Sequence, residues 1–238
     1  MICECPPPTP PEDCVECGER PCVCEKEEYA CDECWQTPCI CVKKVKIRLA
    51  PGKELTITHT TSTTFYHPDG KPMSAQDFVV YLFGELPKFF KNEEELRQLW
   101  GDADTRSKLL EKLGKKGLGM GQLREMRRLI DAEDSDIYDV LAHVAFTKEP
   151  ISRQERVEMQ RDAVHADYDD KQREFLDFVL DQYVNEGVQE LAADKLEPLL
   201  VLKYDTVNDA VDQLGPPKDI RKMFLEFQKH LYQEDLAA

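Results

Sequence analysis

The stretch SDIYDVLAHVAFTKEPISRQER, residues Ser135–Arg156, carries the clearest structural pattern in the chain. Its first half repeats apolar side chains at helical spacing, at Ile137, Val140, Leu141 and Val144. This spacing predicts one amphipathic helix. Ser152, followed three residues later by Glu155, forms a capping box and predicts the start of a second helix. Consecutive helices that each bury one face are typical of a helical bundle.

The same pattern recurs on both sides of this stretch. Before it, the sequence predicts helices that begin at the cap residues Ser74 and Asn92, and two more over about 104–116 and 121–130. After it, a stripe at 176–183 predicts a helix that stops at Gly187, and a stripe at 220–231 predicts the last helix. The apolar run 196–202 fits either a short helix or a buried strand.

Residues 45–66 are the one convincing β region in the sequence. Apolar and charged residues alternate from Val45, Pro51-Gly52 offers a turn, and a return strand leads into the stretch Thr60–Thr64. A two-stranded hairpin is marginal alone, so its apolar face must pack on other elements. We therefore expect a mainly α protein, in which a small β-hairpin and an irregular Cys-rich segment precede a multi-helix bundle. The expected division is 1–44 for the Cys-rich segment with its linker and 45–238 for the rest.

All ten cysteines lie in residues 3–41, and eight of them form a duplicated unit. Each copy reads C-x2-C-x4-C-x-C, and the second copy follows seventeen residues after the first. The eight residues are Cys14, Cys17, Cys22, Cys24, Cys31, Cys34, Cys39 and Cys41. Four thiolates with C-x2-C spacing suit tetrahedral Zn(II), so we expect two zinc ions, one for each unit. An iron–sulfur cluster uses the same ligands and is the less favoured alternative.

Disulfide bonds and scattered structural cysteines account for this pattern less well. A disulfide framework requires an oxidising compartment, and the start MICECPPP has neither a basic region nor an apolar run that would direct secretion. Scattered structural cysteines would not repeat in register. Cys3 and Cys5 have the spacing of the second half of a unit, and we expect from this that the chain starts inside a longer ancestral sequence.

The charge distribution limits the classes of partner. A formal net charge of −16 argues against a dedicated nucleic-acid binder, which needs concentrated Lys and Arg. Two stretches are nevertheless basic, Lys43–Lys53 and Lys108–Arg128, and each is either a solvated face or a contact for DNA phosphate or an acidic partner. No apolar stretch approaches the roughly 20 residues that cross a bilayer, so we expect a cytoplasmic protein without a membrane partner.

Motifs of catalysis or cofactor binding do not emerge from the sequence. The stretch Gly114–Gly121 lacks G-K-[ST] and a preceding strand, so an inter-helix turn is the better interpretation than a phosphate loop. The triplet Asp169-Asp170-Lys171 fits a helix start rather than a nuclease site. The histidines are dispersed, at His59, His67, His143, His165 and His230. We expect no catalytic residue, no cofactor-binding residue and no ATP site in this chain.

Four stretches resemble the C-terminal domain of R subunits of type I restriction enzymes, in the EcoEI-like group. They are ITHTTSTTFYHPDGKPMSAQDFVVYLFGELPKFF (Ile57–Phe90), SDIYDVLAHVAFTKEPISRQER (Ser135–Arg156), DDKQREFLDFVLDQYVNEGVQEL (Asp169–Leu191) and FQKHLYQ (Phe227–Gln233). The likeness runs in order over roughly 43–236. R subunits of this family carry a nuclease domain and two RecA-like motor domains that translocate DNA with ATP, and a helical C-terminal domain.

The resemblance implies a role that belongs to the last of these parts. In the family, the helical domain docks the motor and nuclease on the methyltransferase core of M and S subunits. The resemblance therefore implies a non-catalytic assembly module whose partners are M and S subunits. A second interpretation is a stand-alone zinc-ribbon protein, an adaptor or a nucleic-acid binder that uses the Cys loops and Lys43–Lys53. The acidic composition and the family likeness favour the first.

Overall fold

The computed structural model describes residues 44–58 and 65–233 of the chain. The chain divides into two units, Met1–Val45 and Lys46–Ala238, and nearly all described residues belong to the second. The predicted metal ligands, Cys14 to Cys41, lie outside the described residues, as does the stretch Thr60–Thr64. The architecture that can be compared with the predictions is therefore that of the second unit.

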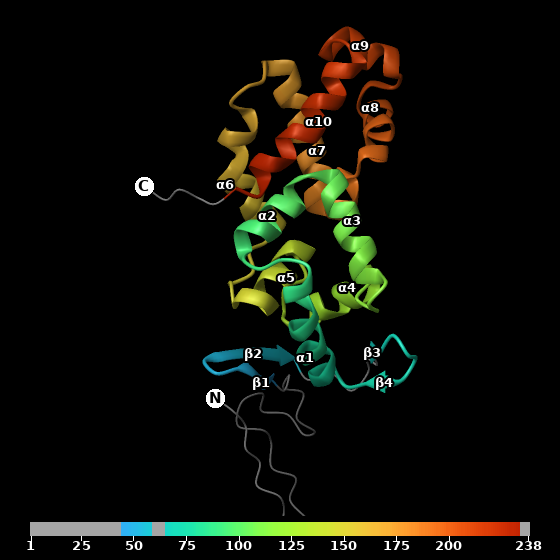
Figure 1. Ribbon diagram of the computed structural model, residues 1–238. Helices are drawn as coiled ribbons and strands as arrows, with labels where there is room; N and C mark the ends of the chain where they lie inside the picture. The colour runs from blue at the N-terminus through green and yellow to red at the C-terminus, as the bar shows by residue number, and fades with distance from the viewer. Residues whose placement is uncertain (1–43, 59–64, 234–238) are drawn as a thin grey trace, which may run out of the picture. The chain divides into compact units, whose positions relative to one another are not determined.

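Most of the described residues are helical, which confirms the mainly α class (Figure 1). The α-helices are α1 (Ala75–Glu85), α2 (Glu93–Gly101), α3 (Ala103–Gly114), α4 (Met120–Leu129), α5 (Ile137–Phe146), α6 (Arg153–His165), α7 (Asp170–Glu186), α8 (Leu196–Tyr204), α9 (Val207–Leu214) and α10 (Pro217–Leu231). Three 3-10 turns join them: η1 (Leu86–Lys88), η2 (Val188–Leu191) and η3 (Ala193–Lys195).

The predicted hairpin is present as β1 (Lys44–Ala50) and β2 (Lys53–Thr58), which pair in a two-stranded sheet. Its apolar side chains Ile47, Leu55 and Ile57 are buried. Lys53 ties the hairpin to the helices, because its Nζ donates a hydrogen bond to the Ala145 carbonyl oxygen at 2.8 Å. As expected for two strands, the hairpin is held by packing on neighbouring elements.

A second, smaller ladder follows that the sequence did not predict. The strands β3 (Phe65–Tyr66) and β4 (Pro72–Met73) are antiparallel, with Phe65 opposite Met73. The Phe65 ring stacks on Phe78 of α1 with a centroid separation of 4.1 Å. Two-residue strands are too short to show an alternating pattern in the sequence. The contact of Phe65 with Phe78 accounts for the position of this ladder.

The predicted helix starts are confirmed by their caps. The side chains of Ser74 and Asn92 accept hydrogen bonds from the backbone at the third following residue, and Ser152 with Glu155 forms the full capping box. The ambiguous run 196–202 is helical and belongs to α8. Helix α9 was missed, because it is eight residues long and buries only Ala210 and Leu214.

The Gly-rich stretch is an inter-helix turn, as predicted. It joins α3 to α4, and Gly117 adopts a left-handed conformation with φ of 74°. A Cβ at Gly117 would lie 3.1 Å from Pro68 Cγ, so both the conformation and the space favour glycine there.

The helices assemble around the stretch Ser135–Arg156. Helix α5 contacts α1, α2 and α4, and α10 packs against α6, α2 and α9, so the C-terminal helix closes the core of the second unit (Figure 1). Trp100, Tyr138 and Phe224 are among the largest side chains that are fully buried there. No helix of the described residues is long and apolar enough to cross a membrane.

Candidate functional site: an arginine-lined groove

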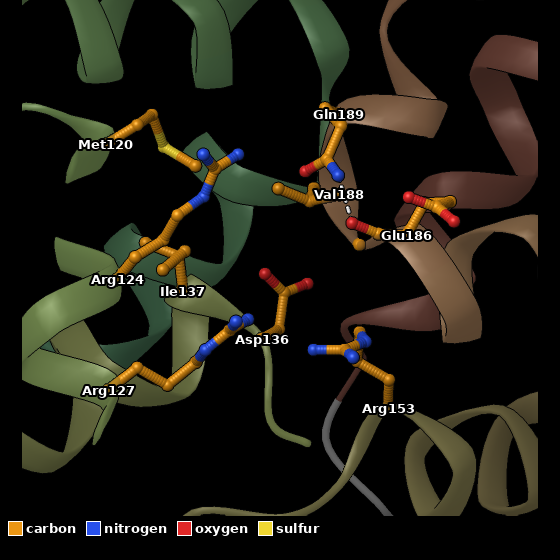
Figure 2. Close-up of a pocket in the computed structure, with 10 residues that line it drawn as sticks. Met120, Arg124, Arg127, Asp136, Ile137, Arg153, Glu186, Val188 and Gln189 are labelled. Atoms are coloured by element: carbon orange, nitrogen blue, oxygen red, sulfur yellow. Dashed lines mark hydrogen bonds between the residues drawn. The ribbon is translucent and has the colours of Figure 1, made fainter. Parts of the chain in front are cut away.

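Two adjoining hollows lie where α3, α4, η2 and the starts of α5 and α6 meet. The first, here called the arginine pocket, has a volume of about 270 Å³ and is lined by Arg124, Arg127, Asp136, Arg153, Val188 and Gln189, among others (Figure 2). The second, here called the apolar lobe, has a volume of about 410 Å³ and is lined mainly by Ala103, Leu110, Met120, Val188, Ala192 and Ala193. Because they share Met120, Arg124, Val188 and Gln189, the two hollows form one groove.

Arg153 is placed in the pocket by the pairing of two segments that are distant in sequence. Ser135 and Ser152 form an isolated antiparallel bridge, and the Arg153 backbone N–H donates to the Asp134 carbonyl oxygen at 2.8 Å. The Arg153 side chain, 8% exposed, donates from Nη1 to the Ser135 carbonyl oxygen at 2.7 Å and from Nε to the Val184 carbonyl oxygen at 2.8 Å. These acceptors are neutral, so they position the guanidinium without cancelling its charge.

Arg127 and Arg124 come from successive turns of α4. Arg127 donates from Nη1 to the same Ser135 carbonyl oxygen at 3.2 Å, and its Nε is buried without a hydrogen-bond partner among the described residues. Burial and the neighbouring Arg153 guanidinium lower the pKa of Arg127. Arg124 is exposed and makes no hydrogen bond or ion pair with any residue that the structure describes.

The carboxylate nearest these arginines is engaged by other groups. Asp136, 1% exposed, caps α5 by accepting from the Tyr138 backbone N–H. Its Oδ2 also accepts hydrogen bonds from the hydroxyls of Tyr183, at 2.8 Å, and Tyr232. Burial, followed by the nearby Asp136 carboxylate, raises the pKa of both tyrosines well above the ordinary value, so they remain donors at neutral pH.

The side chains converge on the space beside Asp136. Figure 2 shows Arg127 and Arg153 turning their guanidinium groups toward it, whereas Arg124 directs its guanidinium toward Met120 and the Glu186 carboxylate turns away. The Gln189 side-chain amide donates to the Glu186 carbonyl oxygen, which fixes the opposite wall. Two guanidinium groups therefore face one carboxylate that is already hydrogen-bonded. Arg124 lines the same pocket, so the pocket keeps an excess of positive charge.

A buried arginine fixes the floor of the neighbouring apolar lobe. Arg106 of α3 is 3% exposed, and its guanidinium donates to the carbonyl oxygens of Trp100 and Leu191 and to Gln228 Oε1, at 2.8–3.0 Å. These bonds join α2, α3, η2 and α10. The lobe thus has a rigid base, which favours a preformed binding surface.

A second arginine–aspartate cluster lies close by and is closed. Arg156 donates from Nη2 to Asp139 Oδ1 at 2.6 Å, and both side chains are buried. The Arg156 guanidinium lies 5.0 Å from the ring centroids of Tyr138 and Tyr232. Burial acts to lower the pKa of Arg156, but the Asp139 carboxylate outweighs it and the pKa lies above the ordinary value. This cluster is neutral overall and has a structural role.

The two predicted basic stretches contribute unequally to the groove. Of the basic residues in Lys108–Arg128, only Arg124 and Arg127 line the groove, whereas Lys115 pairs with Glu111 and Arg128 pairs with Glu125, at 2.6 and 2.8 Å. In Lys43–Lys53, Arg48 pairs with Glu54 at 3.4 Å and Lys53 anchors the hairpin, while Lys43 lies outside the described residues. Lys108, Lys112 and Lys115 are exposed to solvent.

Sequence reasoning missed Arg153 and Asp136 as members of this site. Both belong to local helix patterns, and no spacing rule relates position 153 to 127. The four described histidines have partners: His67 pairs with Asp69, His143 with the Lys148 carbonyl, His165 with Asp177, and His230 with the Gln233 amide, while His59 lies outside the described residues. Asp169, from the D-x-K triplet, is the N-cap of α7. Within 44–58 and 65–233, no cluster of His, Cys, Asp and Glu could hold a metal ion.

Comparison with known proteins assigns the chain to a family. The family described as EcoEI R protein C-terminal matches residues 76–232, which is more than half of the chain and includes the whole groove. The chain belongs to this family. It is also similar to a type I restriction enzyme EcoAI endonuclease subunit from Escherichia coli, with 25% identity over 174 residues.

The match covers 71% of this chain and 21% of the Escherichia coli subunit. The chain therefore corresponds to a small share of that relative's length. No solved structure matches it. The family match confirms the predicted resemblance to the C-terminal domain of type I R subunits. It supports a restriction-enzyme component.

Proposed function

We propose that this chain is the assembly module of a type I restriction R subunit, which docks the DNA-translocating motor and nuclease on the core of M and S subunits. Its family membership supports a restriction-enzyme component. The observation that carries the docking role is the groove, in which three uncompensated arginines adjoin an apolar lobe. Concave surfaces that combine apolar contact area with a few fixed charges are typical of recognition sites.

In this role the chain contributes no catalytic residue, and the ATP-dependent translocation and cleavage belong to other parts of the assembled enzyme. Arg127 and Arg153 are held by the Ser135 backbone carbonyl, and Asp136 accepts from a tyrosine hydroxyl, an arrangement that positions charge but offers no nucleophile. Positioned arginines of this kind favour affinity and orientation in protein–protein contacts.

We also propose that the duplicated cysteine unit binds two zinc ions through Cys14, Cys17, Cys22, Cys24, Cys31, Cys34, Cys39 and Cys41. Closed four-thiolate cages contribute folding free energy to short segments that have little apolar core. In the assembled enzyme, this unit would brace the connection to the motor.

The docking proposal is tested by mixing the chain with M and S subunits from the same source. Size-exclusion chromatography with in-line mass determination should show a complex that contains all three proteins. A chain that elutes alone at low ionic strength would overturn the docking role. Salt-sensitive binding of a DNA duplex by such a lone chain would support the zinc-ribbon alternative.

A further inference from the structure

We infer that the groove binds an acidic–apolar segment of the partner protein, with one carboxylate side chain in the arginine pocket and a neighbouring apolar side chain in the apolar lobe. This inference deepens the proposed docking function and rests on it. It assigns a chemistry to the partner and a site to the contact.

The first argument is the unused hydrogen-bonding capacity of the pocket. Arg124 has no partner among the described residues, and Arg127 keeps a buried Nε without an acceptor. A guanidinium presents five N–H donors in a planar fork that fits a carboxylate in a bidentate manner. An entering carboxylate would supply the acceptors that the pocket lacks.

The second argument is charge. The chain has a formal net charge of −16, yet the pocket gathers Arg124, Arg127 and Arg153 around Asp136, whose oxygens already accept from Tyr183, Tyr232 and a backbone N–H. Unlike Arg156, these arginines have no carboxylate at ion-pair distance among the residues that the structure describes. A partner carboxylate would therefore find complementary charge at this place on an otherwise acidic protein.

The third argument selects a peptide rather than a nucleic acid. The lobe beside the pocket is lined by apolar side chains, including Leu110, Met120 and Val188, which a sugar–phosphate backbone would not use. Its rim carries the carboxylates of Asp104 and Asp194, and Glu186 stands at the edge of the arginine pocket. A polyanion would be repelled by this rim, whereas a segment with a single carboxylate beside an apolar residue fits both halves of the groove.

The test compares Arg124→Glu with Arg128→Glu in binding of the M–S core. Both positions are exposed on α4 and one turn apart, but Arg128 is paired with Glu125 and Glu133 and lies outside the groove. Arg124→Glu should weaken binding by more than about tenfold, because a like charge would face the partner carboxylate. Arg128→Glu should change binding by less than about threefold.

A direct probe uses a random peptide library displayed on phage and selected on the full-length chain. Peptides that place Asp or Glu next to Leu, Ile or Met should be enriched, and they should be lost when the Arg124→Glu chain is the target. Enriched peptides that lack a carboxylate, or that bind both chains equally, would overturn the inference.

The outcomes separate this inference from the docking proposal. If the wild-type chain fails to bind the core, the docking proposal fails. If the core binds the wild type and Arg124→Glu equally well, docking stands and the groove inference fails. If Arg124→Glu instead abolishes salt-sensitive binding of a DNA duplex and leaves core binding intact, the groove contacts phosphate and the inference is overturned.

Discussion

The two arginine–aspartate clusters at the start of α5 use the same chemistry with opposite results. In the closed cluster, Asp139 neutralises Arg156 at 2.6 Å, and the pair is covered by Tyr138 and Tyr232. In the open cluster, tyrosine hydroxyls donate hydrogen bonds to Asp136, and Arg127 and Arg153 donate to neutral backbone carbonyls. The partner of each carboxylate therefore decides whether a nearby arginine stabilises the fold or remains available to a ligand.

The largest expected effect is on the closed cluster. Arg156→Ala should lower the free energy of unfolding by about 3–5 kcal/mol, because Asp139 is left buried without its counter-ion. Urea denaturation monitored by circular dichroism measures this change. The double variant Arg156→Met with Asp139→Leu should lose clearly less than Arg156→Ala. Equal loss in both variants would show that packing, and not charge pairing, dominates the cluster.

A smaller effect is expected at the base of the open cluster. Tyr183→Phe removes one of the two hydroxyls that donate to buried Asp136 and should cost about 1–3 kcal/mol of unfolding free energy. Tyr66→Phe is the control, since Tyr66 is 55% exposed. A negligible loss at Tyr183 would mean that the arginines, rather than the tyrosines, compensate Asp136. The clusters would then differ less than their geometry indicates.

Glu93 is partly exposed and is linked to the closed cluster through the Tyr138 hydroxyl. Its pKa predicts a pH dependence of stability. Glu93 accepts hydrogen bonds from Arg97, Lys148 and the Tyr138 hydroxyl. Burial acts to raise the pKa of Glu93, but the bonds from Lys148 and Arg97 outweigh it, and the pKa lies below the ordinary 4.5. Its contribution to stability is therefore present above pH 4.5 and lost as pH falls through the lowered pKa.

Glu93→Gln should accordingly reduce the unfolding free energy by less than about 1 kcal/mol at neutral pH. The difference from wild type should shrink as the pH falls below 4.5. Denaturation at several pH values tests this sign, and a difference that grows on acidification would contradict it.

A still smaller effect on stability is expected at the rim of the open cluster. Arg124→Ala should change the unfolding free energy by less than about 0.5 kcal/mol, because Arg124 is exposed and makes no hydrogen bond or ion pair with a described residue. The same variant should weaken binding of the M–S core. Thermal denaturation and core binding, measured together, check this separation. A large loss of stability would remove the distinction between the clusters.

Both clusters belong to the unit Lys46–Ala238, so loss of the zinc ions that we propose for the cysteine unit should leave them unchanged. Elemental analysis should find about two zinc ions per chain, one per four-thiolate unit. Cys14→Ser or Cys31→Ser should lower this content without altering the melting temperature of the helical part. A shared drop in zinc content and melting temperature would show that the units are coupled.

Most of the helices, the caps at Ser74, Asn92 and Ser152, and the turn at Gly114–Gly121 followed from the amino-acid sequence, because these depend on neighbours within four residues. The sequence also indicated the family, and it placed Arg124 and Arg127 in a basic stretch. Short elements with few buried residues, such as β3, β4 and α9, carried no detectable period.

Which charged groups pair inside the protein and which remain available to a ligand depends on the tertiary fold. The bridge between Ser135 and Ser152 brings Arg153 to Arg127. Tyr183 of α7 and Tyr232, directly after α10, donate hydrogen bonds to Asp136. These contacts join residues up to 96 positions apart, and their strength depends on burial and on the competing partners of each carboxylate. A linear pattern holds no such information, because it records spacing along the chain and not distance in space.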